Sequence, residues 1–449
     1  MLYRRVLVVL GPAFFILSLL LPVDVKVAAT IGTVLWMGAW WIGEVIPLAV
    51  TALIPLVIAP LFGIAPAKEI APTYAKSPIF LFLGGFILAI ALEKYNLHRY
   101  LSGRLLRVFG RSEVGVFVGV SLASYFLSMW ISNTSATLIM VPLILSLGAG
   151  QLTRALAFGA AYSASIGGVA TLIGTPPNIM YAGVMREYGV DVSFLEWMRF
   201  GLPYSMVLEG IFLTLGILWF RLGRRKTGVR FEDVGISRKG RNVLMIFLGA
   251  VLLWLTRSGI DVGVFSIPGW ADLLPFKGAD DSTVAMAATV LLFLGNFVDW
   301  KDTERVPWDA LLLFGGGFAL SHMIVKSGLS EVIVQALKAY SGLPPVVFVG
   351  LWATITLALT ELASNTSISA VFIPLAYSFA VAVGMDAKAL AAVVAVAASG
   401  AFMLPVATPP NMLVYSFKLV SMRDMMRVGV IMNVIALILA VLLVYHLAP

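Results

Sequence analysis

Mainly apolar stretches with few charged residues alternate with short polar connections along almost the whole chain. Those close to the length of a membrane-crossing helix, about 20 residues, lie at 6–23, 27–44, 47–64, 78–95, 202–220, 242–256, 282–298, 307–325 and 428–447. The longest polar connections are the basic loop at 221–241 and the stretch from 257 to 281. This pattern predicts an all-α polytopic membrane protein.

Two longer blocks, the uncharged 114–153 and the apolar 343–385, contain a polar turn. The first is compatible with two full spans or with a re-entrant hairpin that stops near the middle of the membrane, because both place Arg111 and Arg154 on the same side. Its turn holds Ser, Asn and Thr without charge, Gly or Pro, which favours the hairpin over a loop that emerges into water. We therefore expect about eleven transmembrane helices and two re-entrant hairpins, at 113–148 and 343–384.

Composition agrees with a membrane protein. The chain of 449 residues is 60% hydrophobic and 12% charged, with a mean hydropathy of +0.98. Cysteine is absent, which excludes disulfides and thiolate chemistry, and the three histidines lack metal-ligand spacing. The net charge of +8 reflects basic loops on the cytoplasmic side rather than a nucleic-acid partner. That bias predicts a cytoplasmic amino terminus, a carboxy terminus outside and a location in the cell membrane.

Three sequence patterns occur twice at one spacing. SNT at Ser132 recurs at Ser364, an offset of 232 (364 − 132). GTPPNIM, with Thr175, recurs as ATPPNML, with Thr408, an offset of 233 (408 − 175). FLFLGGF ends at 86 and LLLFGGGF at 318, again 232 apart (318 − 86). A shared order and spacing indicate a duplicated unit.

The duplication predicts the domain organisation. We expect a first transmembrane helix at 1–26, a first repeat at 27–225, a basic cytoplasmic linker at 226–241 and a second repeat at 242–449. Each repeat contains one hairpin and one broken helix, the latter at 155–185 and 389–418. Five crossings in each unit turn the second copy upside down, and such inverted repeats bind substrates and ions near the membrane midplane.

The repeated motifs carry groups that bind ions. Ser, Asn and Thr offer oxygens to a cation and N–H or O–H donors to an anion. Pro176 and Pro177 remove two amide donors and must break the helix. We expect the second half-helix to begin at about Asn178, with free amides that favour an anion. Small polar residues also serve helix packing, but packing does not require the same triplet and the same break in both halves.

Two carboxylates stand out beside these motifs. Glu361 is the only charge between Lys338 and Asp386. It is either a functional intramembrane carboxylate or a structural one, hydrogen-bonded behind the hairpin tip. Glu44 lies near a predicted span end, which favours a membrane-boundary position.

The paired SNT and Thr-Pro-Pro-Asn motifs, together with GAFMLPVATPPN from Gly400 to Asn411, resemble those of the divalent anion/sodium symporter family, along nearly the whole chain. The resemblance implies a homodimer in the lipid bilayer whose transport domain carries substrate in an elevator movement. It also implies two sodium sites and a dianion between them. By motif, the first sodium site uses Ser128, Ser132, Asn133 and the Gly174 carbonyl, and the second uses Thr360, Ala363, Asn365 and the Ala407 carbonyl. The substrate carboxylates would meet Asn133, Thr134, Asn365, Thr366, Thr408 and the Pro409 backbone.

The leading functional hypothesis is sodium-coupled uptake of C4 dicarboxylates such as succinate, malate or fumarate. A sodium-independent dicarboxylate exchanger and a carrier of sulfate or a similar oxyanion are alternatives within the family. Outside it, we consider a passive channel and a membrane hydrolase with Ser132 or Ser364 as nucleophile. No His or Lys lies close in sequence to either serine, so we expect a transporter and not an enzyme.

Overall fold

The computed structural model describes residues 2–147, 150–228, 234–261, 266–276, 278–337 and 344–448. Within these ranges the chain is almost entirely helical, with one short antiparallel pair of strands, β1 (Ile260–Asp261) and β2 (Ser266–Ile267). Residues 229–233 of the predicted linker, the hairpin ends 148 and 343, and the terminal residues 1 and 449 lie outside the described residues.

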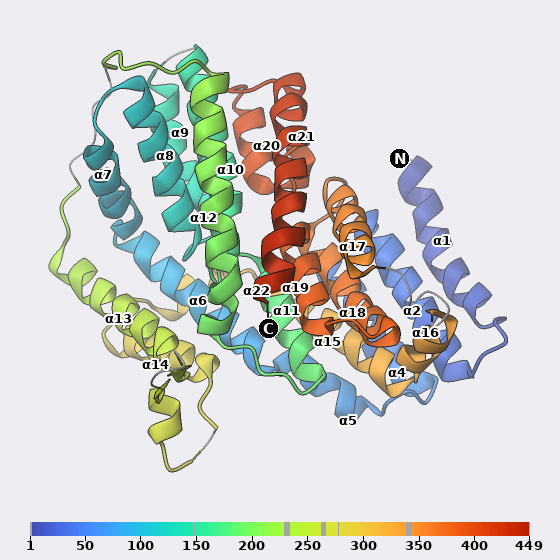
Figure 1. The fold of residues 1–449 in the computed structure, drawn as a ribbon. Coiled ribbons are helices and arrows are strands. Elements are labelled where there is room, and N and C mark those ends of the chain that lie inside the picture. Colours follow the sequence, from blue (N-terminus) through green and yellow to red (C-terminus); the bar gives the residue numbers. More distant parts are fainter. Residues whose placement is uncertain are drawn as a thin grey trace.

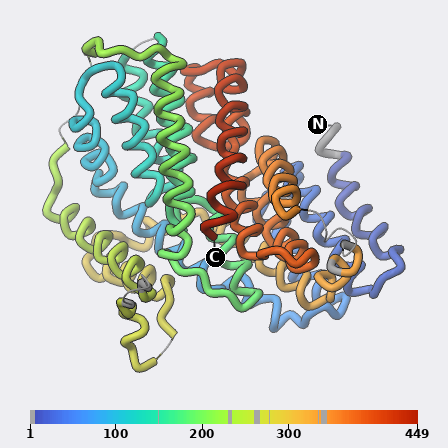
Figure 2. The backbone as a smooth tube through the Cα atoms, in the orientation of Figure 1, coloured from blue at the N-terminus to red at the C-terminus, as the bar shows by residue number. Residues whose placement is uncertain are grey.

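The amino-terminal part of the chain, residues 2–94, forms a series of short and long helices (Figures 1 and 2). They are α1 (Leu2–Ser18), α2 (Val25–Ile42), α3 (Leu48–Thr51), α4 (Ile54–Leu61), α5 (Ala67–Ile70), η1 (Ala71–Ala75) and α6 (Ser77–Lys94). The single span expected at 47–64 is divided into α3 and α4. Pro55 explains this, because it has no N–H to bond the Thr51 carbonyl four residues earlier.

The middle of the chain forms the first copy of the repeated motifs. Its helices are α7 (Leu97–Phe109), α8 (Glu113–Ser128), α9 (Asn133–Leu145), α10 (Gln151–Val169), α11 (Pro176–Glu187) and α12 (Phe194–Trp219). α12 begins well before the expected residue 202. The Ser193 side chain accepts from the Glu196 amide, and the Glu196 carboxylate accepts from the Ser193 amide, a reciprocal cap that starts the helix there.

The remaining helices contain the second copy. They are α13 (Arg238–Leu255), η2 (Trp270–Leu273), α14 (Asp281–Leu294), η3 (Trp300–Arg305), α15 (Trp308–Lys326), α16 (Leu329–Leu337), α17 (Pro345–Thr360), α18 (Asn365–Val383), α19 (Ala387–Ala398), η5 (Pro405–Ala407), α20 (Pro409–Ser416), α21 (Met422–Leu439), a π-helical turn (Ala440–Val444) and α22 (Tyr445–Leu447). Equivalent helices keep the spacing of the motifs. α7 and α16 (329 − 97), α8 and α17 (345 − 113), and α9 and α18 (365 − 133) each begin 232 residues apart.

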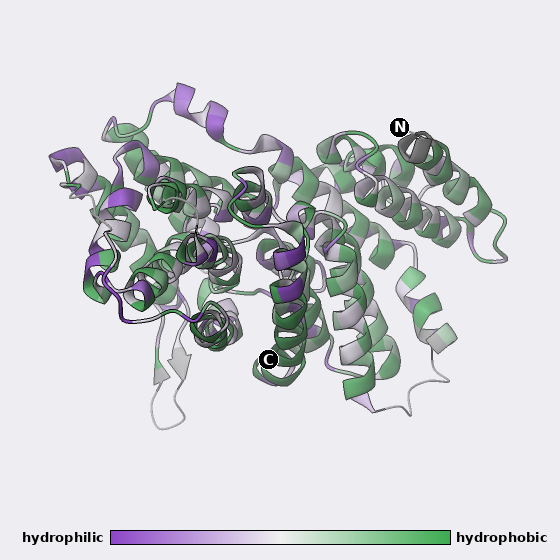
Figure 3. Cartoon of the chain, turned by 90° about the horizontal axis from the view of Figure 1, so that it is seen from above, coloured by the Kyte–Doolittle hydropathy of each residue, from purple (hydrophilic) through white to green (hydrophobic). Residues whose placement is uncertain are grey.

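The helices have the length and surface of membrane spans. Among the described residues, six are long and apolar enough to cross a bilayer: Val25–Ile42, Ala67–Lys94, Phe194–Trp219, Trp308–Lys326, Asn365–Val383 and Met422–Leu447. In the view from above, most of the helical residues are coloured as hydrophobic (Figure 3). The prediction of an all-α polytopic membrane protein is therefore confirmed, while the number eleven stays a prediction.

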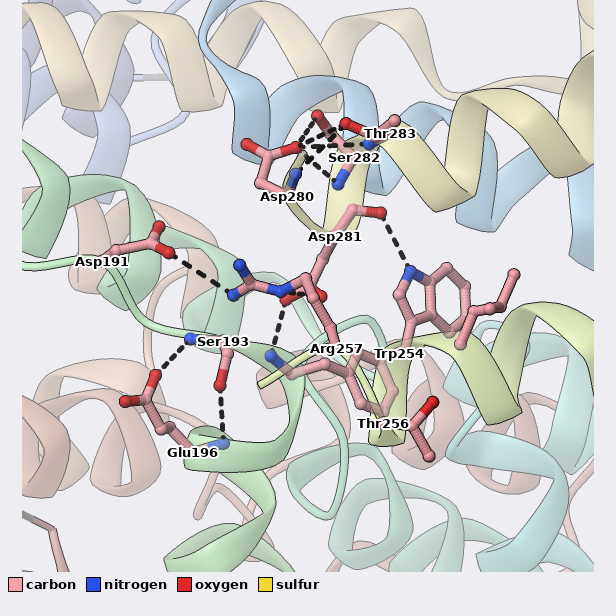
Figure 4. A network of polar contacts seen from close by, with 12 residues as sticks. Asp191, Ser193, Glu196, Trp254, Thr256, Arg257, Asp280, Asp281, Ser282 and Thr283 are labelled. Carbon is pink, nitrogen blue, oxygen red and sulfur yellow. Dashed lines mark hydrogen bonds and ion pairs between the residues drawn. The ribbon is translucent and has the colours of Figure 1, made fainter. Parts of the chain in front are cut away.

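A network of charges links the start of α12 to the facing ends of α13 and α14 (Figure 4). One Asp281 oxygen lies 2.7 Å from Arg257 Nε, and the other accepts a 2.7 Å hydrogen bond from the Phe194 amide. Arg257 Nη2 also lies 3.4 Å from Asp191 Oδ2. The side chains of Arg257 and Asp281 are 10% and 6% exposed, whereas that of Asp191 is 54% exposed.

Asp280, next to this pair, caps α14 by accepting hydrogen bonds from the amides of Ser282 and Thr283. Arg186 from the end of α11 lies 3.0 Å from its other oxygen. Burial alone raises the pKa of Asp280, but hydrogen bonds from two serine hydroxyls and Arg186 outweigh burial and lower the pKa to about 2. This carboxylate therefore stays ionised at physiological pH.

The burial of Arg257 and Asp281 predicts the effect of removing one partner. Arg257→Met leaves a buried carboxylate unpaired and should lower the free energy of unfolding by about 3 kcal/mol. Asp191→Asn removes only the exposed partner and should cost less than about 1 kcal/mol. Denaturation of the purified protein in detergent, followed by tryptophan fluorescence, measures both. Equal losses for the two variants would contradict this ranking.

Candidate functional site

The repeated motifs meet at one cavity of about 1080 Å³. The turns between α8 and α9 and between α17 and α18 reach it, as do the breaks before α11 and α20. Ten of the twelve predicted site residues line it: Ser132, Asn133, Thr134, Gly174, Ala363, Asn365, Thr366, Ala407, Thr408 and Pro409. The other two, Ser128 and Thr360, are buried behind the tips.

The two tips are built alike. Ser128 donates a hydrogen bond of 2.5 Å to Asn133 Oδ1, and Thr360 donates one of 2.6 Å to Asn365 Oδ1. In each case the hydroxyl lies at the end of the first helix and the amide opens the second. The hydroxyl thus holds an asparagine whose side chain contributes to the cavity. The tips differ at the cap, since Ser132 accepts from the Ser135 amide whereas Ser364 makes no such bond.

A glycine lets the first tip approach the first break. A Cβ placed on Gly168 of α10 would lie 2.7 Å from Asn133 Oδ1 and 3.2 Å from the Gly174 carbonyl oxygen. The Asn133 side chain and the Gly174 carbonyl therefore converge on the same small region. Two of the oxygens expected in the first sodium site are brought together in this way.

The helix breaks start slightly earlier than expected. α11 begins at Pro176 and α20 at Pro409, because a proline in the first turn loses no helical hydrogen bond. Thr175 and Thr408 precede them in extended conformations, with φ of −149° and −142°. The expectation that the amides at the helix starts are free to bind an anion is wrong for the first three residues of both α11 and α20. The prolines have no N–H, the Asn178 amide bonds the Thr175 carbonyl, and the Asn411 amide bonds the Thr408 hydroxyl.

The asparagines that close these motifs hold the broken segments together. Asn178 Nδ2 donates to the carbonyls of Gly168 and Thr171, at 2.9 and 2.7 Å. Asn411 Nδ2 donates to the Leu404 carbonyl at 3.1 Å. Both side chains are fully buried. Sequence reasoning left these two residues out of the site, although the repeated final Asn of TPPN was a signal for them.

Glu361 has a structural role at the second break. Its Oε1 accepts from the amides of Phe402 and Met403, at 2.9 and 2.8 Å, and its Oε2 accepts from the Leu404 amide at 2.9 Å. Asn433 Nδ2 adds a bond of 2.6 Å to Oε1. The carboxylate thus satisfies three backbone donors that the break leaves free. The equivalent position in the first copy (361 − 232) is Met129, whose carbonyl accepts a hydrogen bond from Thr171.

The cavity contains almost no charge. Among its described lining residues, Glu44 is the only charged one, and none is Lys, Arg or His. Glu44 follows the end of α2 in a left-handed conformation, φ 45°, and is exposed. The sequence placed it at a membrane boundary, whereas the structure places it in the cavity wall. An anion in this cavity would find hydroxyls, amides and dipoles but no basic side chain.

Comparisons with known proteins show which family and which solved folds this chain resembles. A family model described as citrate transporter matches residues 38–397. The chain is 35% identical over 479 aligned residues to the sodium-dependent dicarboxylate transporter SdcS of Staphylococcus aureus, covering 98% of this chain and 90% of that protein. The solved YdaH transporter of Alcanivorax borkumensis is similar in fold, with a TM-score of 0.60, 16% identity, and 84% and 86% coverage. MtrF of Neisseria gonorrhoeae is also similar, with a TM-score of 0.59, 13% identity, and 87% and 84% coverage.

The bonds of Glu361 predict the effect of its neutral analogue. In Glu361→Gln an N–H group faces backbone donors, so at least one charge-assisted hydrogen bond is lost, at about 2 kcal/mol. We expect a lower free energy of unfolding and faster proteolysis of the segment around Phe402. Glu304→Gln, at an exposed position, should change neither. Unchanged stability and proteolysis of Glu361→Gln would contradict the structural role.

Proposed function

Because the chain belongs to the divalent anion/sodium symporter family, we propose that it takes up a C4 dicarboxylate, such as succinate, malate or fumarate, together with sodium. The observation that carries the proposal is the single cavity on which both SNT tips and both TPPN breaks converge. The name of SdcS, a sodium-dependent dicarboxylate transporter, supports both the substrate class and the ion.

We place one sodium ion at each tip. The first would be held by oxygens of Ser128, Ser132 and Asn133 and by the Gly174 carbonyl. The second would be held by Thr360, Ala363, Asn365 and the Ala407 carbonyl. The matching hydroxyl-to-amide bonds, Ser128 to Asn133 and Thr360 to Asn365, support two sites of one design. In this proposal an incoming ion would share the asparagine oxygens with these hydroxyls.

The dianion would lie between the two ions. Its carboxylates would meet Asn133, Thr134, Asn365, Thr366, Thr408 and the Pro409 backbone, all of which line the cavity. Since none of the described lining residues is basic, a dianion alone would face an uncompensated low-dielectric cavity. Bound sodium supplies the missing positive charge, which gives a physical reason for coupling.

We further propose that the two copies are inverted repeats, with re-entrant hairpins α8–α9 and α17–α18 in an elevator-type homodimer of the cell membrane. In Figure 1, the equivalent helices α12 and α21 lie side by side and run in opposite directions, as inversion requires. The basic residues then place the amino terminus in the cytoplasm and the carboxy terminus outside. A hydrolase is disfavoured, because among the described lining residues no His or Lys could serve as a base for Ser132 or Ser364.

Transport by purified protein in liposomes tests the proposal. Labelled succinate should accumulate only when sodium is higher outside, and collapse of the sodium gradient with an ionophore should abolish accumulation. Uptake that ignores sodium but needs internal dicarboxylate would identify an exchanger instead. Full inhibition by excess sulfate, with weak inhibition by malate, would identify an oxyanion carrier.

A pair of glycine variants tests the first sodium site. Gly168→Ala pushes a methyl group against Asn133 and Gly174, and overpacking of this kind costs about 1 to 3 kcal/mol. The half-saturating sodium concentration should therefore rise about tenfold. Gly400, 232 residues later (400 − 168), is the control, because a Cβ there meets no predicted site residue. Equal sodium dependence in the two variants would remove Gly174 and Asn133 from the site.

A further inference from the structure

A second intramembrane carboxylate lies away from the cavity, on α12. Glu209 is the only charged residue between Arg199 and Arg221, and it is 3% exposed. It is not among the residues that line the proposed binding cavity. An ionisable group at such a position in a membrane helix is by default a functional candidate.

The Glu209 carboxylate has far fewer partners than Glu361. Ser163 of α10 donates a 2.8 Å hydrogen bond to Oε1, and Oε2 is buried without a hydrogen-bond partner. Among the described residues, no basic side chain of α10, α13 or α21 forms an ion pair with it. Arg154 of α10 lies near Asp424 instead, and Arg257, which follows α13, lies near Asp191 and Asp281. Glu361, by contrast, accepts four hydrogen bonds.

The surroundings of Glu209 are hydroxyl-rich and otherwise uncharged. Ser205, one turn earlier on α12, lies 2.8 Å from the hydroxyl of Tyr125 on α8. Among the titratable side chains that the structure describes, Tyr125 lies close enough to Glu209 to interact with it electrostatically. Ser121 of α8 packs against Gly159, one turn before Ser163, and its hydroxyl is buried without a partner. The Ser163 hydroxyl of α10 therefore contacts Glu209 directly, and the Tyr125 hydroxyl of α8 contacts Ser205 one turn earlier on α12.

A single neutral donor does not offset the charge of a carboxylate buried in a membrane protein, because the unpaired charge costs several kcal/mol. The charge must be neutralised by a bound cation. A proton needs only one carboxylate oxygen, and Oε2 is the oxygen without a partner. A dehydrated metal ion needs several oxygens, whereas one hydroxyl, that of Ser163, is within hydrogen-bond distance of the carboxylate.

We propose that Glu209 is a proton-binding site, protonated in the conformation described here. The proton comes from water when the helices around it open, binds one carboxylate oxygen, and leaves by the same route. The proton site itself does not depend on the transported substrate. A consequence for transport follows and rests on the proposed function. Uptake should depend on the protonation of Glu209, which lies in the same group of helices as the first hairpin.

Infrared spectroscopy of the full-length protein in lipid bilayers tests the site directly. The carbonyl band of a protonated carboxyl should be present at neutral pH in wild type and lost in Glu209→Gln. Ser163→Ala should keep the band and move it to higher frequency, because the carboxyl group loses its hydrogen-bond donor. Glu304→Gln, at an exposed position in η3, should match wild type.

Transport provides the second readout. As the pH rises through the range in which the infrared band disappears, wild-type succinate uptake under a constant sodium gradient should fall several-fold, whereas that of Glu209→Gln should stay nearly constant. Identical carboxyl bands in wild type and Glu209→Gln would overturn the proposal. So would a band that sodium removes at constant pH, since sodium would then be the occupant. If no variant transports succinate, the proposed function fails while the infrared result still decides the proton site.

Discussion

Breaking a helix inside a membrane leaves backbone groups that lipid cannot satisfy, and the arrangement of this protein depends on how the two paired breaks are compensated. Prolines at the start of α11 and α20 remove donors that would otherwise be free. Asn178 and Asn411 bond the carbonyls of the broken segments, and Glu361 accepts three amides at the second break. These buried groups satisfy much of the backbone at the breaks, so most of the polar side chains at the cavity surface are not needed for that task.

The cavity between the compensated breaks lacks positive charge. Its described lining contains hydroxyls, amides and one exposed carboxylate but no basic side chain. A dianion would enter such a space only with cations, so charge balance gives a physical reason for coupling. The buried carboxylate of Glu361 does not alter this balance, because its oxygens are directed to the backbone of residues 402–404.

The repeated motifs predict which residues form the candidate site. They do not predict the buried contacts that hold those residues in place. The offset of 232 residues was enough to pair Asn133 with Asn365, and the structure brings both to one cavity. The hydrogen bond that Asn433 donates to Glu361, 72 residues away, depends on tertiary packing. No local sequence pattern encodes it. The apolar pattern assigns the residues of α7 and α16 to polar connections, because charged and polar residues interrupt their apolar positions. Glu209 was overlooked, although the test applied to Glu361, a lone charge in an apolar span, also selects it.

Equilibrium binding of labelled succinate to the purified protein tests the central claim most directly, because it needs neither a gradient nor a conformational change. Sodium would be replaced stepwise by potassium at constant ionic strength. The account predicts that affinity rises steeply with sodium, that binding is lost in potassium alone, and that Asn133→Ala and Asn365→Ala each weaken the sodium dependence. Equal succinate affinity in sodium and potassium would contradict a site that cations complete.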